Sequence, residues 1–446
     1  MDFKFIPDLP IDSKFDDALG FNDFIEVLQS SIQNTETPFV YGVLGNWGTG
    51  KTSILRLLNN RIEQELQNGY SHSIPIWFNA WEYENESNLI YPLFNSIKRD
   101  YKTRLKTKEL SNKFANQFLN VISSSTLALG DIGIRIITKA LTGEAIKLED
   151  IEKHIKSVKD HSNEIENALN SWTDQIYTLK NNFELLLDAY ANDYPFETQE
   201  AKDDARFVIL IDDLDRCLPD TVIAILEKIK NFLSVKRCVF VLALNQKIVY
   251  QGIKIKYNGL EINGREYLEK ILNYSFYVPE PEVKSIELYC ERSLEKLVGN
   301  DGKKLFSEQL DRFGKTLGDC NFNNPRKIKR ILNHYLFFLK TNEKELDHYH
   351  LPNIIRLIIL AEYYPSIFEI LLESNSRAKD ENDLVLPDPL GRVVLQREGK
   401  TSINQEINRI EMSQIRKLLD LVMPENRSVA GLEEHIKSVF RIVRLS

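Results

Sequence analysis

In Gly45-Asn46-Trp47-Gly48-Thr49-Gly50-Lys51-Thr52, the glycines and the Lys-Thr pair have the spacing of a phosphate-binding loop. An apolar run, Phe39–Leu44, precedes the loop and predicts a strand, and Ser53–Leu58 after it predicts a helix. Glycines let successive N–H groups point at one anion, and the helix adds its positive N-terminal end. The stretch therefore predicts a nucleoside triphosphate site between a strand and a helix.

The side chains of this loop have separate expected roles. We expect Lys51 to reach the β- and γ-phosphates and Thr52 to hold Mg²⁺. A Gly-rich strand-to-helix turn without a ligand is the alternative, which the flanking strand and helix disfavour. The residues expected to contact the nucleotide are Gly45, Asn46, Trp47, Gly48, Thr49, Gly50, Lys51, Thr52 and Ser53.

A second apolar run, Phe207–Ile211, ends in acidic residues and predicts a strand buried on both faces. Asp212 at its carboxyl end is placed to bind Mg²⁺, and two adjacent acids are costly to bury without a cation. Asp213 is the candidate to orient or deprotonate the attacking water. Arg216 either forms an ion pair with Asp215 or reaches the phosphate of a neighbouring subunit.

Two further strand ends carry polar side chains toward the same expected crevice. After the run 74–78, Asn79, Trp81 and Glu82 are placed to face the ligand, although the tryptophan equally suits a core position. After the run 238–244, Asn245 is a candidate to hydrogen-bond the γ-phosphate or water and so sense hydrolysis.

A helix is predicted to begin at Asn324, with Asn324 as its cap and Pro325 at its first position. Two basic residues of this helix, Arg326 and Arg330, are candidates to contact the phosphates from a helical lid. A basic face that is simply solvated is the alternative for both residues.

Composition limits the classes of function. The chain has 446 residues, which predicts two or three domains, and a net charge of -8 argues against non-specific coating of nucleic acid. Its four cysteines lie far apart without a Cys-x-x-Cys pair, and no signal peptide is recognised at the start. We therefore expect a reducing, cytoplasmic compartment and no zinc site.

Residues 98–141 combine a basic segment with an apolar one, Phe118–Leu141. Asp131, Arg135 and Lys139 interrupt the apolar part and disfavour a membrane-spanning helix. Two alternatives remain as expectations. The segment either makes peripheral contact with an anionic membrane surface or a partner, or it forms a buried helical hairpin. The basic residues of the segment are Lys98, Arg99, Lys102, Arg104, Lys106, Lys108 and Lys113.

An apolar seam with alternating steps of four and three runs from Ile151 to Leu186 and predicts one long helix. The seam packs either within the chain or against another subunit. Its position between the two nucleotide-binding halves marks it as part of a helical insert.

Several blocks together resemble one known family: Gly45 to Thr52 with Trp47, Phe78 to Trp81, Asp212 to Cys217, Tyr267 to Lys270 and Asn324 to Arg326. They are similar to the KAP family of P-loop NTPases. The resemblance implies an α/β fold, a P-loop NTPase parallel sheet related to the STAND and AAA-like ATPases. It further implies a long helical insert between the Walker motifs and a helical C-terminal lid.

The resemblance also implies a function and an organisation. We expect ATP and Mg²⁺ as ligands, and a nucleotide-driven conformational switch in a bacterial anti-phage defence system. Partners are expected among other defence proteins or in a homo-oligomer, in the cytoplasm or peripherally at the inner membrane. The alternatives are a non-hydrolysing ATP-gated scaffold and a DNA-acting motor; nucleic acid binding is not indicated. The expected domains are 1–107 and 201–280 (NTPase core), 108–200 (insert), 281–345 (lid) and 346–446 (C-terminal helices).

Overall fold

The computed structural model describes residues 5–8, 10, 17, 19–84, 90–106, 109–129, 165–232, 235–257, 263–282, 284–293, 313–318, 320, 322–342, 350–365, 368–369 and 433–445. The chain divides into two compact units. The first, which we call the sheet unit, comprises Pro10–Lys14 and Phe21–Pro279. The second, the helical unit, comprises Met1–Leu9, Phe15–Gly20 and Glu280–Ser446.

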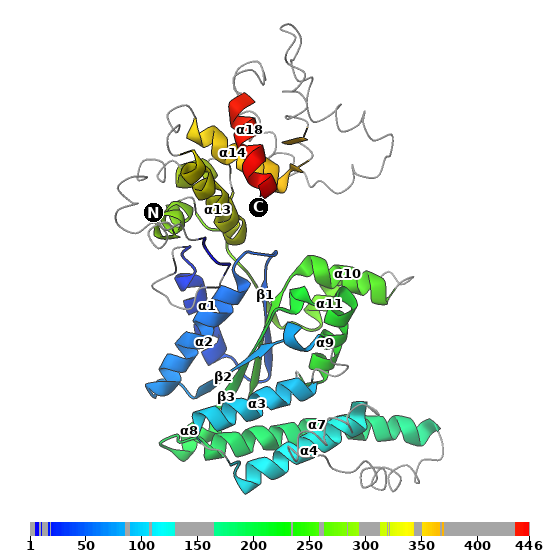
Figure 1. Ribbon diagram of the computed structural model, residues 1–446. Helices are drawn as coiled ribbons and strands as arrows, with labels where there is room; N and C mark the ends of the chain where they lie inside the picture. The colour runs from blue at the N-terminus through cyan, green and yellow to red at the C-terminus, as the bar shows by residue number, and fades with distance from the viewer. Residues whose placement is uncertain are drawn as a thin grey trace. The chain divides into compact units, whose positions relative to one another are not determined.

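A five-stranded parallel sheet forms the centre of the sheet unit, with the order β2-β3-β4-β1-β5 (Figure 1). Its strands read as nearly uninterrupted apolar runs because helices cover both faces, and every residue of β4 is buried. The α/β parallel-sheet fold expected from the sequence is therefore confirmed. The strands are β1 Phe39–Leu44, β2 Ser73–Asn79, β3 Arg206–Asp212, β4 Cys238–Leu244 and β5 Tyr274–Tyr277.

The register brings the carboxyl ends of the strands to one edge. Leu44 of β1 lies opposite Leu244 of β4, and Asn79 of β2 lies opposite Asp212 of β3. β4 separates β1 from β3, so the residue that follows β4 lies between the phosphate-binding loop and the acidic block. In open parallel sheets this edge is where ligands bind.

Helices cover the two faces of the sheet. Figure 1 shows α1 and α2 on one side and α9, α10 and α11 on the other. A Cβ atom at Gly252 would lie 2.0 Å from the carbonyl oxygen of Pro219, so only glycine lets α10 lie this close to α9. The bounds are α1 Asn22–Asn34, α2 Lys51–Gln67, α9 Pro219–Phe232, α10 Gln246–Lys256 and α11 Gly264–Glu269.

The insert between β2 and β3 contributes α3 Ile90–Arg104, α4 Asn112–Leu129 and α7 Ile165–Asp193. α4 and α7 lie side by side below the sheet in Figure 1. Phe114 and Phe118 of α4 and Phe183 of α7 are buried in one apolar core with residues of the sheet. The residues of the apolar segment and of the seam whose side chains are described, such as Phe118 and Leu186, thus pack within the chain. Residues 130–141 and 151–164, and the side chains of 125–129 and 165–176, lie outside the described part of the chain.

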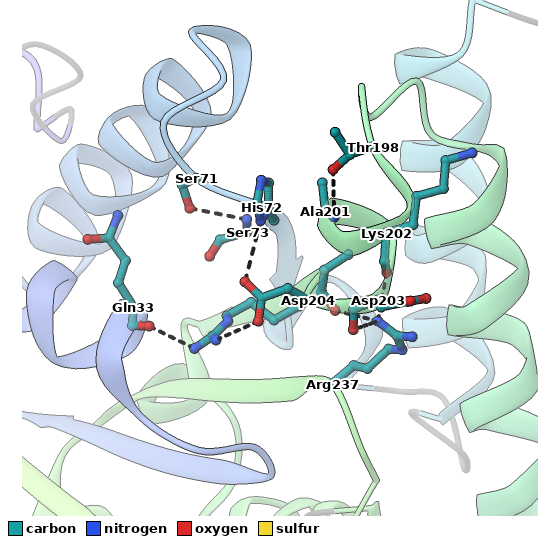
Figure 2. A network of polar contacts seen from close by, with 12 residues as sticks. Gln33, Ser71, His72, Ser73, Thr198, Ala201, Lys202, Asp203, Asp204 and Arg237 are labelled. Atoms are coloured by element: carbon teal, nitrogen blue, oxygen red, sulfur yellow. Dashed lines mark hydrogen bonds and ion pairs between the residues drawn. The ribbon is translucent and has the colours of Figure 1, made fainter.

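A polar network ties the insert to the opposite, amino-terminal edge of the sheet (Figure 2). Arg237, just before β4, donates from Nη1 to the carbonyl oxygens of Lys202, Asp203 and Ala205, and its Nε lies 2.6 Å from Asp188 Oδ1 on α7. The short helix α8, Gln199–Asp203, is capped by Thr198, whose hydroxyl accepts from Ala201 N. The insert is therefore fixed at the edge remote from the phosphate-binding loop.

The helical unit contains α13 Pro325–Thr341, α14 Leu351–Tyr363 and α18 Glu433–Leu445 among its described elements. Asn324 Oδ1 accepts from Lys327 N at 3.2 Å, which confirms the predicted cap, and Pro325 stands in the first turn. Within this unit, Ile6 N donates to Asn333 Oδ1 at 2.8 Å. None of the helices in the described ranges has the length and apolarity needed to cross a bilayer.

Candidate functional site

The phosphate-binding loop joins the buried strand β1 to the first turn of α2. Gly48 and Gly50 have positive φ values of 78° and 100°, which turn the backbone into the helix and which L-residues rarely adopt. Thr49 Oγ1 donates to the carbonyl oxygen of Asn46 at 2.9 Å, which closes the loop. Trp47 is exposed at its tip, and Ser53 is buried in the helix that follows. The loop therefore has the curled form that a polyphosphate requires.

Lys51 is buried and its ammonium group is surrounded by acceptors of its own chain. Nζ donates to the carbonyl oxygens of Gly45 and Asn46, each at 3.0 Å. It also lies 2.7 Å from Asp215 Oδ2. The ammonium group is thus enclosed by two hydrogen-bond acceptors from the loop and one ion-pair partner from the acidic block.

Thr52 and Asp212 meet across the edge of the sheet, with Thr52 Oγ1 donating to Asp212 Oδ1 at 3.2 Å. Burial, followed by the nearby Asp213 carboxylate, raises the pKa of Asp212 to about 6. A hydroxyl and a carboxylate are hard oxygen ligands, and Mg²⁺ typically takes one or two such protein ligands together with phosphate and water. The pair fits Mg²⁺, and a cation beside Asp212 would offset the cost of its buried charge.

Asp213 has a left-handed backbone, with φ at 57°, which turns its carboxylate back toward the end of β2. Its Oδ1 lies 2.8 Å from Arg216 Nε, and its Oδ2 accepts from Asn79 Nδ2 at 3.3 Å. The predicted ion pair of Arg216 with Asp215 is therefore wrong. Arg216 pairs with Asp213, and Asp215 pairs with Lys51, because the short 3₁₀ turn η3, Leu214–Arg216, points the two side chains in different directions.

Trp81 and Glu82 follow Asn79 in the 3₁₀ turn η2, Trp81–Tyr83, and both are exposed. Trp81 is 46% exposed and its ring lies under the Arg216 guanidinium, 5.2 Å from ring centroid to Cζ, so the core position considered for Trp81 is wrong. Asn79 Oδ1 accepts from Trp81 N at 3.1 Å and holds the turn. Trp81 thus belongs to the rim of the site.

Asn245 is buried at the end of β4, beside the phosphate-binding loop: Gly45 N donates to the carbonyl oxygen of the preceding Leu244 at 3.1 Å. Its side-chain oxygen accepts from Lys247 N at 3.0 Å and caps α10. This capping gives Asn245 a structural role in addition to any role in sensing the nucleotide.

Arg326 and Arg330, the candidate lid residues, lie on α13 of the helical unit. Arg326 Nε lies 2.6 Å from Asp8 Oδ2, and Arg330 Nε lies 3.0 Å from Glu362 Oε2. Both arginines therefore have acidic partners within their own unit. Their contact with phosphate stays a prediction.

Two functional candidates escaped the sequence reasoning. The sequence offers Asp215 only as a partner of Arg216, whereas the structure places it in η3, just after β3, with its carboxylate beside Lys51. Glu84 was not singled out, yet its Oε1 accepts from Leu218 N at 2.7 Å. No local pattern signals either contact, because each joins separate strand ends.

Cys217, the last residue of the acidic block, is buried and poorly suited to act as a nucleophile. Burial, and after it the charges of Glu84, Asp213 and Asp215, raises the pKa of its thiol to about 12. The thiolate, which is the reactive form, is therefore disfavoured at neutral pH. In the ranges that the structure covers, no group of three or more His, Cys, Asp or Glu residues is arranged to hold a metal ion.

Comparison with known proteins adds an independent result. The family model described as "KAP family P-loop domain" matches residues 21–341. The phage T7 exclusion protein of Escherichia coli (strain K12) is 20% identical over 376 residues, which are 81% of this chain and 47% of that protein. This chain thus spans about half the length of that relative.

Other similarities are narrower or more remote. An uncharacterized protein of Methanocaldococcus jannaschii is 28% identical over 173 residues, 35% of this chain and 82% of the relative. The Aeropyrum pernix ORC1 protein, solved in complex with DNA, has 12% identity and a TM-score of 0.35 over 84% of this chain and 76% of its own. The family match, by contrast, includes every site residue from Gly45 to Arg330.

Proposed function

The chain belongs to the KAP family of P-loop NTPases, and from this premise we propose that it is a Mg²⁺-dependent ATPase that works as a nucleotide-driven conformational switch. One observation carries the proposal. Lys51 and Thr52 follow β1, Asp212 and Asp213 stand at the end of β3, and β4 separates these two strands, yet Thr52 contacts Asp212 at one sheet edge. A phosphate-binding loop beside paired acids suits hydrolysis of a phosphoanhydride.

Each residue has a role in this proposal. The backbone of Gly45–Thr52 and the Lys51 ammonium bind the phosphates, and Thr52 and Asp212 hold Mg²⁺. When bound, Mg²⁺ supplies positive charge that neutralises the phosphate oxygens. Asp213, positioned by Asn79, orients the attacking water or accepts its proton. Asn245 follows the strand between these groups and is suited to sense the γ-phosphate.

The cellular role we propose is that of a component of a bacterial anti-phage defence system. Similarity to a protein named for phage T7 exclusion supports it. The partner is another defence protein or a second copy of this chain, in the cytoplasm. We further propose that any peripheral contact of 98–141 with the inner membrane is made by exposed basic side chains such as Arg99 and Lys113, because the apolar Phe114 and Phe118 are buried.

The first test is phosphate release from ATP by the purified protein. We expect hydrolysis that requires Mg²⁺ and that falls to background in Lys51→Ala, since the ammonium contacts the phosphates that carry the developing charge. The matched control is Lys102→Ala on α3, which leaves the loop intact. Hydrolysis at an unchanged rate in Lys51→Ala would contradict the proposal.

A second candidate function is an ATP-gated scaffold that binds nucleotide without useful turnover. It is favoured by the contacts of Asp213, whose two oxygens are both engaged, by Arg216 and by Asn79. Asp213→Asn separates the two functions because it removes the base and keeps the shape. Loss of phage protection in cells supports the ATPase, whereas full protection without hydrolysis supports the scaffold.

A further inference from the structure

We propose that Asp215 is a positioning residue that competes with the phosphates of ATP for Lys51 and links nucleotide binding to the rim of the site. The inference rests on the proposed function, since it takes ATP as the ligand. Asp215 follows β3 in η3, whereas Lys51 opens α2. The two residues are thus brought together only by the fold.

The contact is a buried ion pair. Lys51 Nζ lies 2.7 Å from Asp215 Oδ2, and both side chains are only 6% exposed. Two loop carbonyls accept hydrogen bonds from the same ammonium group. The phosphates of ATP can therefore bind the Lys51 ammonium group only by replacing at least one of these three partners.

Asp215 is the acceptor that ATP displaces. A carboxylate beside a phosphate experiences like-charge repulsion, which is strong in a site shielded from water. Carbonyl oxygens carry no net charge, and the loop needs them to keep its curled form. Removing the charge of Asp215 should therefore strengthen ATP binding, because the competing acceptor becomes weaker.

Displacement of Asp215 would move the turn η3, and the residues of this turn and just beyond it contact the segment that follows β2. The neighbouring Arg216 lies over the ring of Trp81, and Leu218, just beyond the turn, donates its N–H to Glu84. Trp81 and Glu84 both follow β2, on the segment that leads toward α3 and the insert. A movement of η3 therefore reaches the start of the insert through these two contacts.

The test measures the affinity of the full chain for ATP by calorimetric titration. The titration is done at low temperature so that ATP is not hydrolysed during the measurement. We expect Asp215→Asn to bind ATP about tenfold more tightly than the wild type, because the substitution removes the negative charge that competes for Lys51 and repels the phosphates. The matched control is Asp220→Asn, an exposed carboxylate at the start of α9, which should leave the affinity unchanged.

The Lys51→Ala background separates this inference from the proposed function. Asp215→Asn should tighten binding clearly less when Lys51 is absent, because only the like-charge repulsion, and no competition for the ammonium group, is then removed, whereas a general change of structure would act equally in both backgrounds. If Asp215→Asn does not fold, Asp215→Ser replaces it in the same pair of measurements. Equal or weaker binding, or equal tightening with and without Lys51, overturns the role of Asp215; unchanged ATP binding in Lys51→Ala overturns the proposed function itself.

Discussion

At the scale of single residues, Arg216 shows how the acidic block is organised within one chain. Its guanidinium bonds Asp213 and covers the ring of Trp81, so it has both a charged and an aromatic partner. An arginine that reaches a neighbouring subunit would have to leave both contacts. The geometry favours a role for Arg216 inside its own subunit.

This assignment predicts a modest effect of Arg216→Ala on ATP hydrolysis. We expect the rate to stay within about tenfold of wild type, because a catalytic arginine finger is worth on the order of 10³-fold or more. The measurement is the steady-state hydrolysis rate per subunit. A larger loss that is recovered when Arg216→Ala is mixed with Lys51→Ala protein would instead show a finger acting between subunits.

At the scale of elements, Arg104 anchors the end of α3 to the sheet unit. Its guanidinium contacts Asp100 at 2.8 Å and Glu63 of α2 at 2.6 Å, and it donates to the carbonyl oxygen of Pro75 in β2 at 2.9 Å. Tyr190 of α7 donates to the same Asp100. One arginine thus joins α2, α3, α7 and a strand.

Arg104→Ala should lower the free energy of unfolding by about 3 kcal/mol, because it leaves two largely buried carboxylates without a cation. Urea denaturation of the full chain measures the change. Arg99→Ala, an exposed arginine on the same helix, serves as the control and should change stability by less than about 0.5 kcal/mol. Equal effects of the two substitutions would contradict the anchoring role.

The same variant should be more sensitive to pH than the wild type. Burial raises the pKa of Asp100, and removing Arg104 takes away the largest opposing influence. A carboxyl group whose pKa is higher in the folded state stabilises the fold below its unfolded pKa and loses that contribution as pH rises. The destabilisation by Arg104→Ala should therefore be larger at about pH 8 than at about pH 5. A destabilisation independent of pH would exclude Asp100 as its cause.

At the scale of the whole molecule, the chain consists of a sheet unit and a helical unit. The candidate phosphate and magnesium ligands, Lys51, Thr52 and Asp212, all belong to the sheet unit. A ligand that binds one folded unit stabilises that unit by mass action. Nucleotide should therefore raise the free energy of unfolding of the sheet unit.

Differential scanning calorimetry should show two transitions, of which one responds to ATP and Mg²⁺. At ATP concentrations about 100 times the dissociation constant, the free energy of unfolding in the responding transition should rise by about 2.7 kcal/mol. The transition of the helical unit should not respond. The same shift in Lys51→Ala protein would contradict the placement of the site.

Local sequence was sufficient for much of the fold and part of the site. The apolar runs predicted β1, β2, β3 and β4, and Asn324 with Pro325 predicted the start of α13, because strand burial and helix capping depend on residues close together in the chain. The glycine spacing and the paired acids indicated the phosphate and metal ligands for the same reason. The residues that carry this chemistry lie within a few positions of one another in the chain.

The amino-acid sequence alone thus established the phosphate-binding loop, the acidic strand end and the family resemblance. Tertiary structure alone established the strand order, and with it the partners: Lys51 with Asp215, Asp213 with Arg216, and Glu84 with the backbone of Leu218. These contacts join segments distant in sequence or depend on the direction in which a short turn points its side chains. Lys51 with Asp215 and Glu84 with Leu218 follow from long-range packing, for which spacing along the chain carries no signal, and Asp213 with Arg216 follows from the backbone conformation of the turn.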